Sequence, residues 1–131
     1  MEPKKILIVD DQSFIRQVFS QQLKGELEGI TIIEAANGSE AIGKAKVSKP
    51  DLILLDIVMP TTDGFKVLEE LAADPHTYEI PILVVSSHAD DENVSRAKEL
   101  GAREFVDKAS LNDIDFVGLV RRYLYADEEV A

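Results

Sequence analysis

The sequence contains no cysteine and only two histidines in 131 residues. Without cysteine, the chain has no disulfide bond, no thiol nucleophile and no thiolate ligand for zinc. Two histidines are too few for a histidine-rich metal site. The lack of cysteine also fits a reducing compartment.

Long hydrophobic runs and excess basic charge are lacking too. The run at residues 6–9 is too short for a signal peptide, and a bilayer-spanning helix needs roughly 20 apolar residues. Lys and Arg number 14 against 25 Asp and Glu, so the formal net charge is −11. Such a charge repels the phosphates of nucleic acids. We therefore expect a cytoplasmic protein that binds neither membranes nor, directly, nucleic acid.

The composition is that of a globular domain, with 45% hydrophobic and 30% charged residues. Three short runs, at residues 6–9, 52–55 and 82–85, are apolar throughout and do not alternate with polar residues. This pattern is typical of strands buried on both faces of a parallel sheet. Two weaker strands are predicted at residues 31–35 and 104–107.

Amphipathic helices are predicted between the strands, because apolar side chains recur there every three or four residues. Ser39 is expected to cap the second helix, Gly101 to end the fourth, and Gly64 to adopt a positive φ in a turn. Five strand–helix repeats predict an α/β fold, a doubly wound (βα)5 domain with a five-stranded parallel sheet. The helical stripes comprise Ile15, Phe19, Leu23 and Leu27; Ala41, Ile42 and Ala45; Phe65, Leu68, Leu71 and Ala72; Val94, Ala97 and Leu100; and Phe116, Val117, Val120 and Leu124.

Polar side chains follow four of the five predicted strands. Ligands of open parallel sheets bind beyond the carboxyl ends of the strands, so these side chains form a candidate site. Two carboxylates about 4 Å apart repel each other by roughly 4 kcal/mol, and a bound Mg²⁺ is the simplest compensation. The residues at the strand ends are Asp10, Asp11, Asp56, Ser86, Ser87, Asp107 and Lys108.

A carboxylate beside Mg²⁺, an ammonium and a hydroxyl suits phosphoryl transfer, which depends mainly on positioning and electrostatics. Asp56 stands alone at its strand end and is the candidate nucleophile, which would form an aspartyl-phosphate. Asp10 and Asp11 are better placed to bind the metal. Ser86 and Lys108 can each bind a phosphoryl oxygen.

Specific motifs surround these residues: residues 6–11, residues 51–60 followed by Asp63 and Gly64, residues 80–86, and residues 101–102 before 105–108. Together they resemble the receiver domain of bacterial two-component response regulators, the fold of the single-domain chemotaxis regulator. The resemblance implies a flavodoxin-like strand order, 2-1-3-4-5. The resemblance covers about residues 4–124, the core of the domain. The length predicts that residues 1–131 form one receiver domain, and the polar composition of residues 125–131 predicts a frayed acidic tail.

The resemblance implies a role for each acidic residue. Asp56 matches the phosphoacceptor and Asp11 the direct Mg²⁺ ligand, while Asp10 acts on the ion mostly through water. The third protein ligand is implied to be the backbone carbonyl of Val58. The phosphoryl group is implied to come from a sensor histidine kinase, a phosphotransfer protein or a small donor such as acetyl phosphate.

The resemblance also implies a conformational switch. Ser86 matches the switch hydroxyl, Lys108 the lysine of the site, and Phe105 the aromatic residue whose rotamer follows phosphorylation. The partner surface is expected on the fourth helix, fifth strand and fifth helix, where a downstream protein effector would bind. The protein is expected to be a monomer or weak dimer. It is not expected to be an enzyme, except that it promotes its own aspartyl phosphorylation and dephosphorylation.

Three positions depart from the family pattern. Ala109 replaces the usual proline after the lysine, so a trans peptide bond is expected there. Val58 and His88 flank the phosphoryl site, where a polar or acidic residue often orients the hydrolytic water. Because the side chain of Val58 cannot hydrogen-bond to water, we predict slow self-dephosphorylation.

Four alternatives remain open. A degenerate receiver would bind partners without phosphorylation, but it would need a missing acceptor, acid or lysine. An aspartyl-phosphate phosphatase needs a carboxylate where Val58 stands. A flavin-binding domain needs a Ser-, Thr- or Gly-rich loop after the first strand, and residues 10–12 are instead acidic. A DNA-binding regulator is possible only if an output domain lies outside these 131 residues, which leave no room for one.

Overall fold

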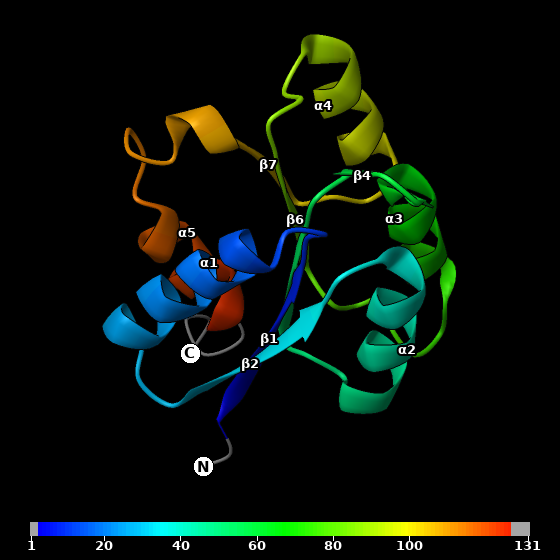
Figure 1. The fold of residues 1–131 in the computed structure, drawn as a ribbon. Helices are drawn as coiled ribbons and strands as arrows, with labels where there is room; N and C mark the ends of the chain where they lie inside the picture. Colours follow the sequence, from blue (N-terminus) through cyan, green and yellow to red (C-terminus); the bar gives the residue numbers. More distant parts are fainter. Residues whose placement is uncertain (1–2, 127–131) are drawn as a thin grey trace.

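A five-stranded parallel sheet forms the centre of the computed structural model, which describes residues 3–126. The strand order is β2-β1-β3-β6-β7 (Figure 1), which is the predicted 2-1-3-4-5 order because β6 and β7 are the fourth and fifth strands of this sheet. The strands are β1 (Lys4–Val9), β2 (Ile30–Ala35), β3 (Leu52–Leu55), β6 (Ile82–Ser86) and β7 (Glu104–Asp107).

Helices cover both faces of the sheet (Figure 1). Helices α1 and α5 pack on one face, and α2, α3 and α4 pack on the other, so the predicted doubly wound architecture is confirmed. Among residues 3–126, no helix has the length and hydropathy needed to cross a membrane. The helices are α1 (Ser13–Glu26), α2 (Gly38–Ser48), α3 (Gly64–Ala73), α4 (Asp91–Glu99) and α5 (Phe116–Leu124), with a 3₁₀ turn, η1 (Lys108–Ser110), before α5.

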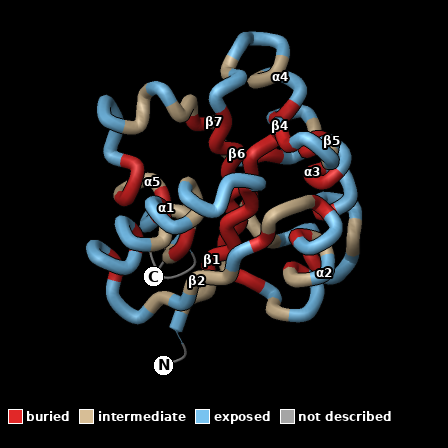
Figure 2. Tube along the Cα trace, viewed as in Figure 1, coloured by how far each residue is buried: buried red, intermediate tan, exposed pale blue. Residues whose placement is uncertain are grey.

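The three central strands are buried on both faces, as their unbroken apolar runs predict (Figure 2). Successive side chains of a strand point to opposite faces. Leu7 and Val9 therefore pack against α2, α3 and α4, whereas Ile6 and Ile8 pack against α1 and α5. Burying a side chain of this kind contributes roughly 1.5–3 kcal/mol, which makes the sheet a rigid support for the residues that follow it.

Three sequence predictions at turns have clear outcomes. Gly101 has φ of +114° just after α4, which confirms it as the residue that ends this helix. The prediction for Ser39 is wrong, because the N-cap of α2 is Asn37, whose side chain accepts a hydrogen bond from the amide of Glu40. All peptide bonds of the described chain are trans, including the one before Ala109.

The loop after β3 is more ordered than the sequence indicates. It forms a short antiparallel hairpin from β4 (Val58–Met59) and β5 (Thr62–Asp63). The predicted positive φ of Gly64 is wrong, because the only described residues with positive φ lie elsewhere. Glycine is required here by close approach instead, since a Cβ atom at Gly64 would lie 2.2 Å from the Cα atom of Ile57.

Candidate functional site

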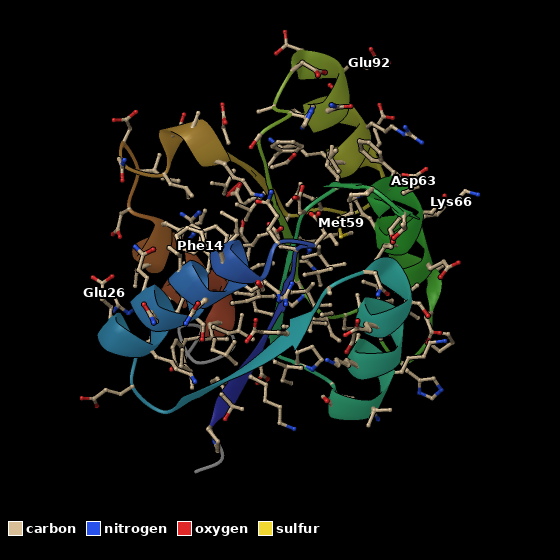
Figure 3. All side chains as sticks on the ribbon, viewed as in Figure 1. Phe14, Glu26, Met59, Asp63, Lys66 and Glu92 are labelled. Carbon is tan, nitrogen blue, oxygen red and sulfur yellow. The ribbon has the colours of Figure 1, made fainter. Side chains whose placement is uncertain are left out.

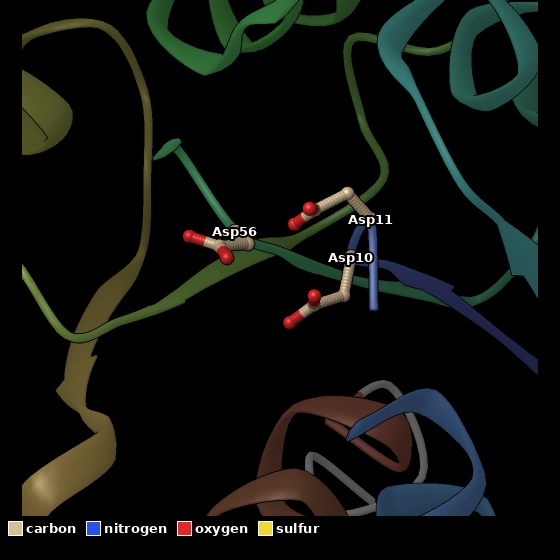
Figure 4. Close-up of side chains that lie close together, drawn as sticks. All are labelled: Asp10, Asp11 and Asp56. Atoms are coloured by element: carbon tan, nitrogen blue, oxygen red, sulfur yellow. The ribbon is translucent and has the colours of Figure 1, made fainter. Parts of the chain in front are cut away.

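Three carboxylates meet at the carboxyl edge of the sheet. Asp10 and Asp11 follow β1, and Asp56 follows the neighbouring strand β3. Val9 and Leu55, the last residues of these strands, are aligned in the register, so the aspartates that follow them lie at the same level of the sheet edge. One ligand oxygen from each aspartate lies within 4.8 Å of the others. Figure 4 shows the carboxylate of Asp11 extending toward Asp56. The structure thus brings together the three acidic residues predicted for the site.

The three carboxylates differ in their surroundings. Asp10 is 2% exposed and Asp56 is 7% exposed, whereas Asp11 is on the surface. Within residues 3–126, the carboxylate of Asp11 has no hydrogen-bond or ion-pair partner. An exposed carboxylate without a protein partner, next to two buried ones, is free to bind a cation from solvent.

Lys108 connects the two buried carboxylates. Its Nζ donates to Oδ2 of Asp10 at 2.8 Å and to Oδ2 of Asp56 at 3.1 Å. Burial alone would lower the pKa of Lys108, but the hydrogen bond from its ammonium to Asp10 and the charge of Asp56 raise the pKa above its ordinary value. The lysine therefore stays charged at neutral pH. These contacts join residues 98 and 52 positions apart in the chain.

Backbone amides fix the second oxygen of each buried carboxylate. The N–H of Gln12 donates to Oδ1 of Asp10 at 2.9 Å, and the N–H of Val58 donates to Oδ1 of Asp56 at 3.0 Å. Each donor lies two residues after its acceptor, so both contacts are local Asx-type turns. Each of the two carboxylates is therefore held by one backbone amide and by the ammonium of Lys108, which they share.

Burial raises the pKa of Asp56 above its ordinary value, although the amide of Val58 and the charge of Lys108 act in the opposite direction. A raised pKa means that folding favours the neutral carboxyl. The ionised form of Asp56 therefore costs stability at neutral pH, and the cost disappears when the carboxyl is protonated in both the folded and the unfolded state.

This shift in pKa predicts a pH-dependent effect of Asp56→Asn on stability without Mg²⁺. At about pH 7 the free energy of unfolding of the variant should be about 1 kcal/mol higher than that of wild type, and this gain in stability should shrink as the pH falls toward about pH 4. Urea unfolding at several pH values measures the difference. Asp113→Asn, the same substitution at an exposed aspartate, is the control and should change little. A gain that is constant with pH would contradict this explanation.

A cavity of about 350 Å³ opens beside the three carboxylates. It brings residues from the strand ends together with residues of the β4–β5 hairpin, and Figure 3 shows Met59 of this hairpin between the sheet edge and α3. The cavity is lined by Asp11, Gln12, Asp56, Val58, Met59, Pro60, Ser87, His88 and Lys108.

The two serines after β6 occupy different environments. Ser86 is fully buried, and its Oγ accepts a hydrogen bond from the amide of His88 at 3.1 Å. Ser87 is exposed and lines the cavity. Ser86 is the last residue of β6 and Ser87 lies just beyond the strand, so of the two serines only Ser87 lines the cavity, whereas the sequence predicts a phosphoryl contact for Ser86.

Phe105 and the flanking residues lie around the site. Phe105 is half-buried and packs against the core on the side of α2, α3 and α4. Val58 and His88 are exposed and line the cavity, where they flank Asp56. Val58 therefore presents an apolar side chain to the space beside the candidate phosphoacceptor.

The donor set fits a hard divalent cation. Carboxylate oxygens are the ligands that Mg²⁺ prefers, and Mg²⁺ usually keeps several waters and needs only one or two carboxylates. Asp11 is accessible and unpaired within the described chain, while Asp10 and Asp56 lie next to it. The three clustered ligand groups are all carboxylates, which favours a hard cation over zinc.

Known proteins are similar to this chain in sequence and in fold. The model of the family described as "Response regulator receiver domain" matches residues 6–116. Protein PilH of Pseudomonas aeruginosa is 33% identical over 104 residues, which cover 79% of this chain and 84% of that protein. A protein-glutamate methylesterase/protein-glutamine glutaminase of Halalkalibacterium halodurans is 37% identical over 108 residues, which cover 81% of this chain and 30% of that protein.

This chain therefore spans less than a third of the methylesterase's length. A crystal structure of a response regulator receiver domain protein (CheY-like) from Methanospirillum hungatei has a TM-score of 0.86 at 27% identity, covering 99% of this chain and 100% of that one. The family match extends over most of the chain and agrees with both the fold and the acidic site. We conclude that this chain belongs to the response regulator receiver domain family.

Proposed function

We propose that this protein is a phosphorylation-activated signalling switch that accepts a phosphoryl group on Asp56 from a partner histidine kinase or phosphotransfer protein. One observation carries the proposal: three carboxylates meet within 4.8 Å at one sheet edge, and Lys108 lies 3.1 Å from Asp56. Membership of the receiver family supports the assignment to two-component signalling.

In the proposed reaction, a carboxylate oxygen of Asp56 attacks the phosphorus of the donor's phosphohistidine. An O–P bond forms as the P–N bond breaks, and the electron pair of that bond remains on the imidazole nitrogen. The ammonium of Lys108, already in contact with Asp56, attracts the negative charge on the phosphoryl oxygens. The amide of Val58 keeps the carboxylate oriented toward the cavity.

Mg²⁺, when bound, would neutralise negative charge on the transferring phosphoryl group. Asp11, Asp10, Asp56 and the backbone carbonyl of Val58 are the proposed ligands. Asp11 supplies an accessible carboxylate without a protein partner in the described chain, and the other two aspartates are already oriented by amides and Lys108.

Phosphorylation adds a charge of about −1.5 to −2 at Asp56, which draws hydrogen-bond donors toward it. We propose that the Ser86 hydroxyl moves toward the new phosphoryl group and gives up its present contact with the amide of His88. The space that it leaves can accept the half-buried ring of Phe105, because Phe105 pairs with Val84, which lies two residues before Ser86 and therefore on the same face of the sheet. The surface of α4, β7 and α5 then changes, and a downstream protein effector responds.

Amide hydrogen exchange tests the switch directly. The protein is incubated with Mg²⁺, with and without acetyl phosphate, and exchange is followed along the chain. The proposal expects altered exchange at α4, β7 and α5 only when the donor is present, and no such change in Ser86→Ala. Equal exchange in phosphorylated and unphosphorylated wild type would contradict a switch.

Val58 is predicted to slow loss of the phosphoryl group, because its apolar side chain cannot orient a hydrolytic water. Val58→Asn, which adds an amide at the cavity wall, should shorten the lifetime of the adduct by about tenfold. The fraction phosphorylated is followed by intact mass after the donor is removed. A wild-type lifetime of only seconds, or no acceleration in the variant, would contradict the prediction.

A further inference from the structure

Behind the acidic pair lies an arginine that the reaction does not use. Arg16, in the first turns of α1, donates from Nη1 to the backbone carbonyl of Asp10 at 2.6 Å and from Nε to Oε1 of Glu34 at 2.9 Å. Its side chain is only 14% exposed, whereas that of Glu34 is 46% exposed. The guanidinium therefore bridges the end of β1 and the edge strand β2 from a mostly buried position.

The carbonyl that Arg16 holds belongs to the peptide unit between Asp10 and Asp11. Because a peptide unit is planar, fixing its oxygen restricts the rotation of the plane that leads to the Cα atom of Asp11. The carboxylate of Asp11 has no partner within residues 3–126, so its position depends on the backbone that carries it. Asp10 is different, because the amide of Gln12 and Lys108 hold its side chain directly.

We propose that Arg16 is a positioning residue for the cation site: it fixes the Asp10–Asp11 peptide and thereby aims the carboxylate of Asp11, with Glu34 anchoring the guanidinium. This inference rests on the proposed function, because it takes Asp11 as a ligand of Mg²⁺. Arginine suits the role because its planar fork makes two hydrogen bonds in fixed directions, which a lysine ammonium on a flexible chain does not reproduce. Groups that orient metal ligands in this way typically change metal affinity by about 10–100-fold when they are removed.

A purely electrostatic role of Arg16 makes the opposite prediction. A positive charge near a cation site weakens binding, so removing it would tighten Mg²⁺ binding, and Arg16→Lys, which keeps the charge, would leave binding unchanged. Positioning predicts weaker binding in both Arg16→Lys and Arg16→Gln. Glu34→Gln, which keeps an acceptor oxygen but loses the ion pair, should have a smaller effect in the same direction.

Isothermal titration of the full chain with MgCl₂ separates these roles. The proposal expects the Kd of Arg16→Lys to rise about tenfold, at the lower end of the usual effect because the contact is to a backbone carbonyl. Arg121→Lys is the matched control, since Arg121 also donates to a backbone carbonyl, that of Glu26 at 3.4 Å, but outside the site. Its Kd should equal that of wild type. An unchanged or lowered Kd in Arg16→Lys would overturn the inference.

A second readout distinguishes positioning from general damage to the fold. With acetyl phosphate as donor, the rate of adduct formation in Arg16→Lys should approach that of wild type when Mg²⁺ is saturating, while half-saturation requires about tenfold more Mg²⁺. A rate that stays low at saturating Mg²⁺ would contradict a role confined to the cation site. If wild type itself fails to bind Mg²⁺, the proposed function fails as well. If wild type binds Mg²⁺ and the Arg16 variants bind it equally well, the proposed function stands and this inference fails.

Discussion

Asp56→Asn is expected to abolish the phosphoryl adduct that wild type forms with acetyl phosphate and Mg²⁺. An amide oxygen is a far weaker nucleophile than a carboxylate, and no other carboxylate occupies the same place between Lys108 and the amide of Val58. Intact-mass spectrometry of the protein before and after incubation measures the fraction that carries one phosphoryl group. Wild type should gain this mass, and the variant should not.

The control for this experiment is Asp113→Asn, an exposed aspartate outside the site, which should form the adduct as wild type does. An adduct that persists in Asp56→Asn would mean that another residue is the acceptor. No adduct in wild type under any donor condition would favour the alternative of a receiver that binds partners without being phosphorylated. Urea unfolding of the variant confirms that it is folded before either conclusion is drawn.

Lys108→Met is expected to lower the free energy of unfolding by about 3 kcal/mol at neutral pH without Mg²⁺, because it leaves Asp10 and Asp56 buried without a positive partner. Methionine keeps most of the volume of the lysine stem, so lost packing contributes little. Urea unfolding with and without Mg²⁺ measures the effect.

The loss of stability in Lys108→Met depends on pH because the carboxylates left behind can take up protons. The charge of Lys108 opposes the rise that burial gives the pKa of Asp56, so without the ammonium that pKa rises further and the folded state is favoured while the carboxyl is protonated. The deficit of Lys108→Met should therefore shrink as the pH falls through the acidic range, and it should shrink when Mg²⁺ supplies the missing positive charge. Lys66→Met, at an exposed lysine of α3, is the matched control. A deficit that is independent of pH and Mg²⁺ would point to lost packing instead.

The sequence predicts the architecture well because a few strong signals dominate it. The runs at β1, β3 and β6 are apolar without interruption, and only a strand covered on both faces can bury such a run. Once those strands are parallel, their carboxyl ends share one edge. The resemblance to the receiver family implies that β1 and β3 are neighbours, and with that order Asp10, Asp11 and Asp56 meet, although 46 positions separate Asp10 from Asp56 in the chain.

The features that sequence analysis missed depend on contacts between distant segments. Gly64 resembles a turn glycine in the sequence, yet the reason for it is the backbone of Ile57 against which α3 begins. Asn37 and Ser39 are both good capping residues, and the choice between them follows from where β2 ends and α2 starts.

Arg16 was not among the predicted site residues, for a related reason. Its two acceptors are a backbone carbonyl and a glutamate 18 residues away, and neither contact has a residue pattern. One sign is present in the sequence: an arginine in the helix that begins at Ser13, two residues after the adjacent aspartates. That sign gains meaning only when the direction of the guanidinium is known.

The most direct test of this account is whether aspartates from two strands form one Mg²⁺ site. The free energy of unfolding is measured for wild type and Asp11→Asn as Mg²⁺ is raised. Wild type should gain about 1.4 kcal/mol when free Mg²⁺ reaches ten times its Kd, and Asp11→Asn should gain little at the same concentration. Equal gains in both proteins, or none in wild type, would contradict the account.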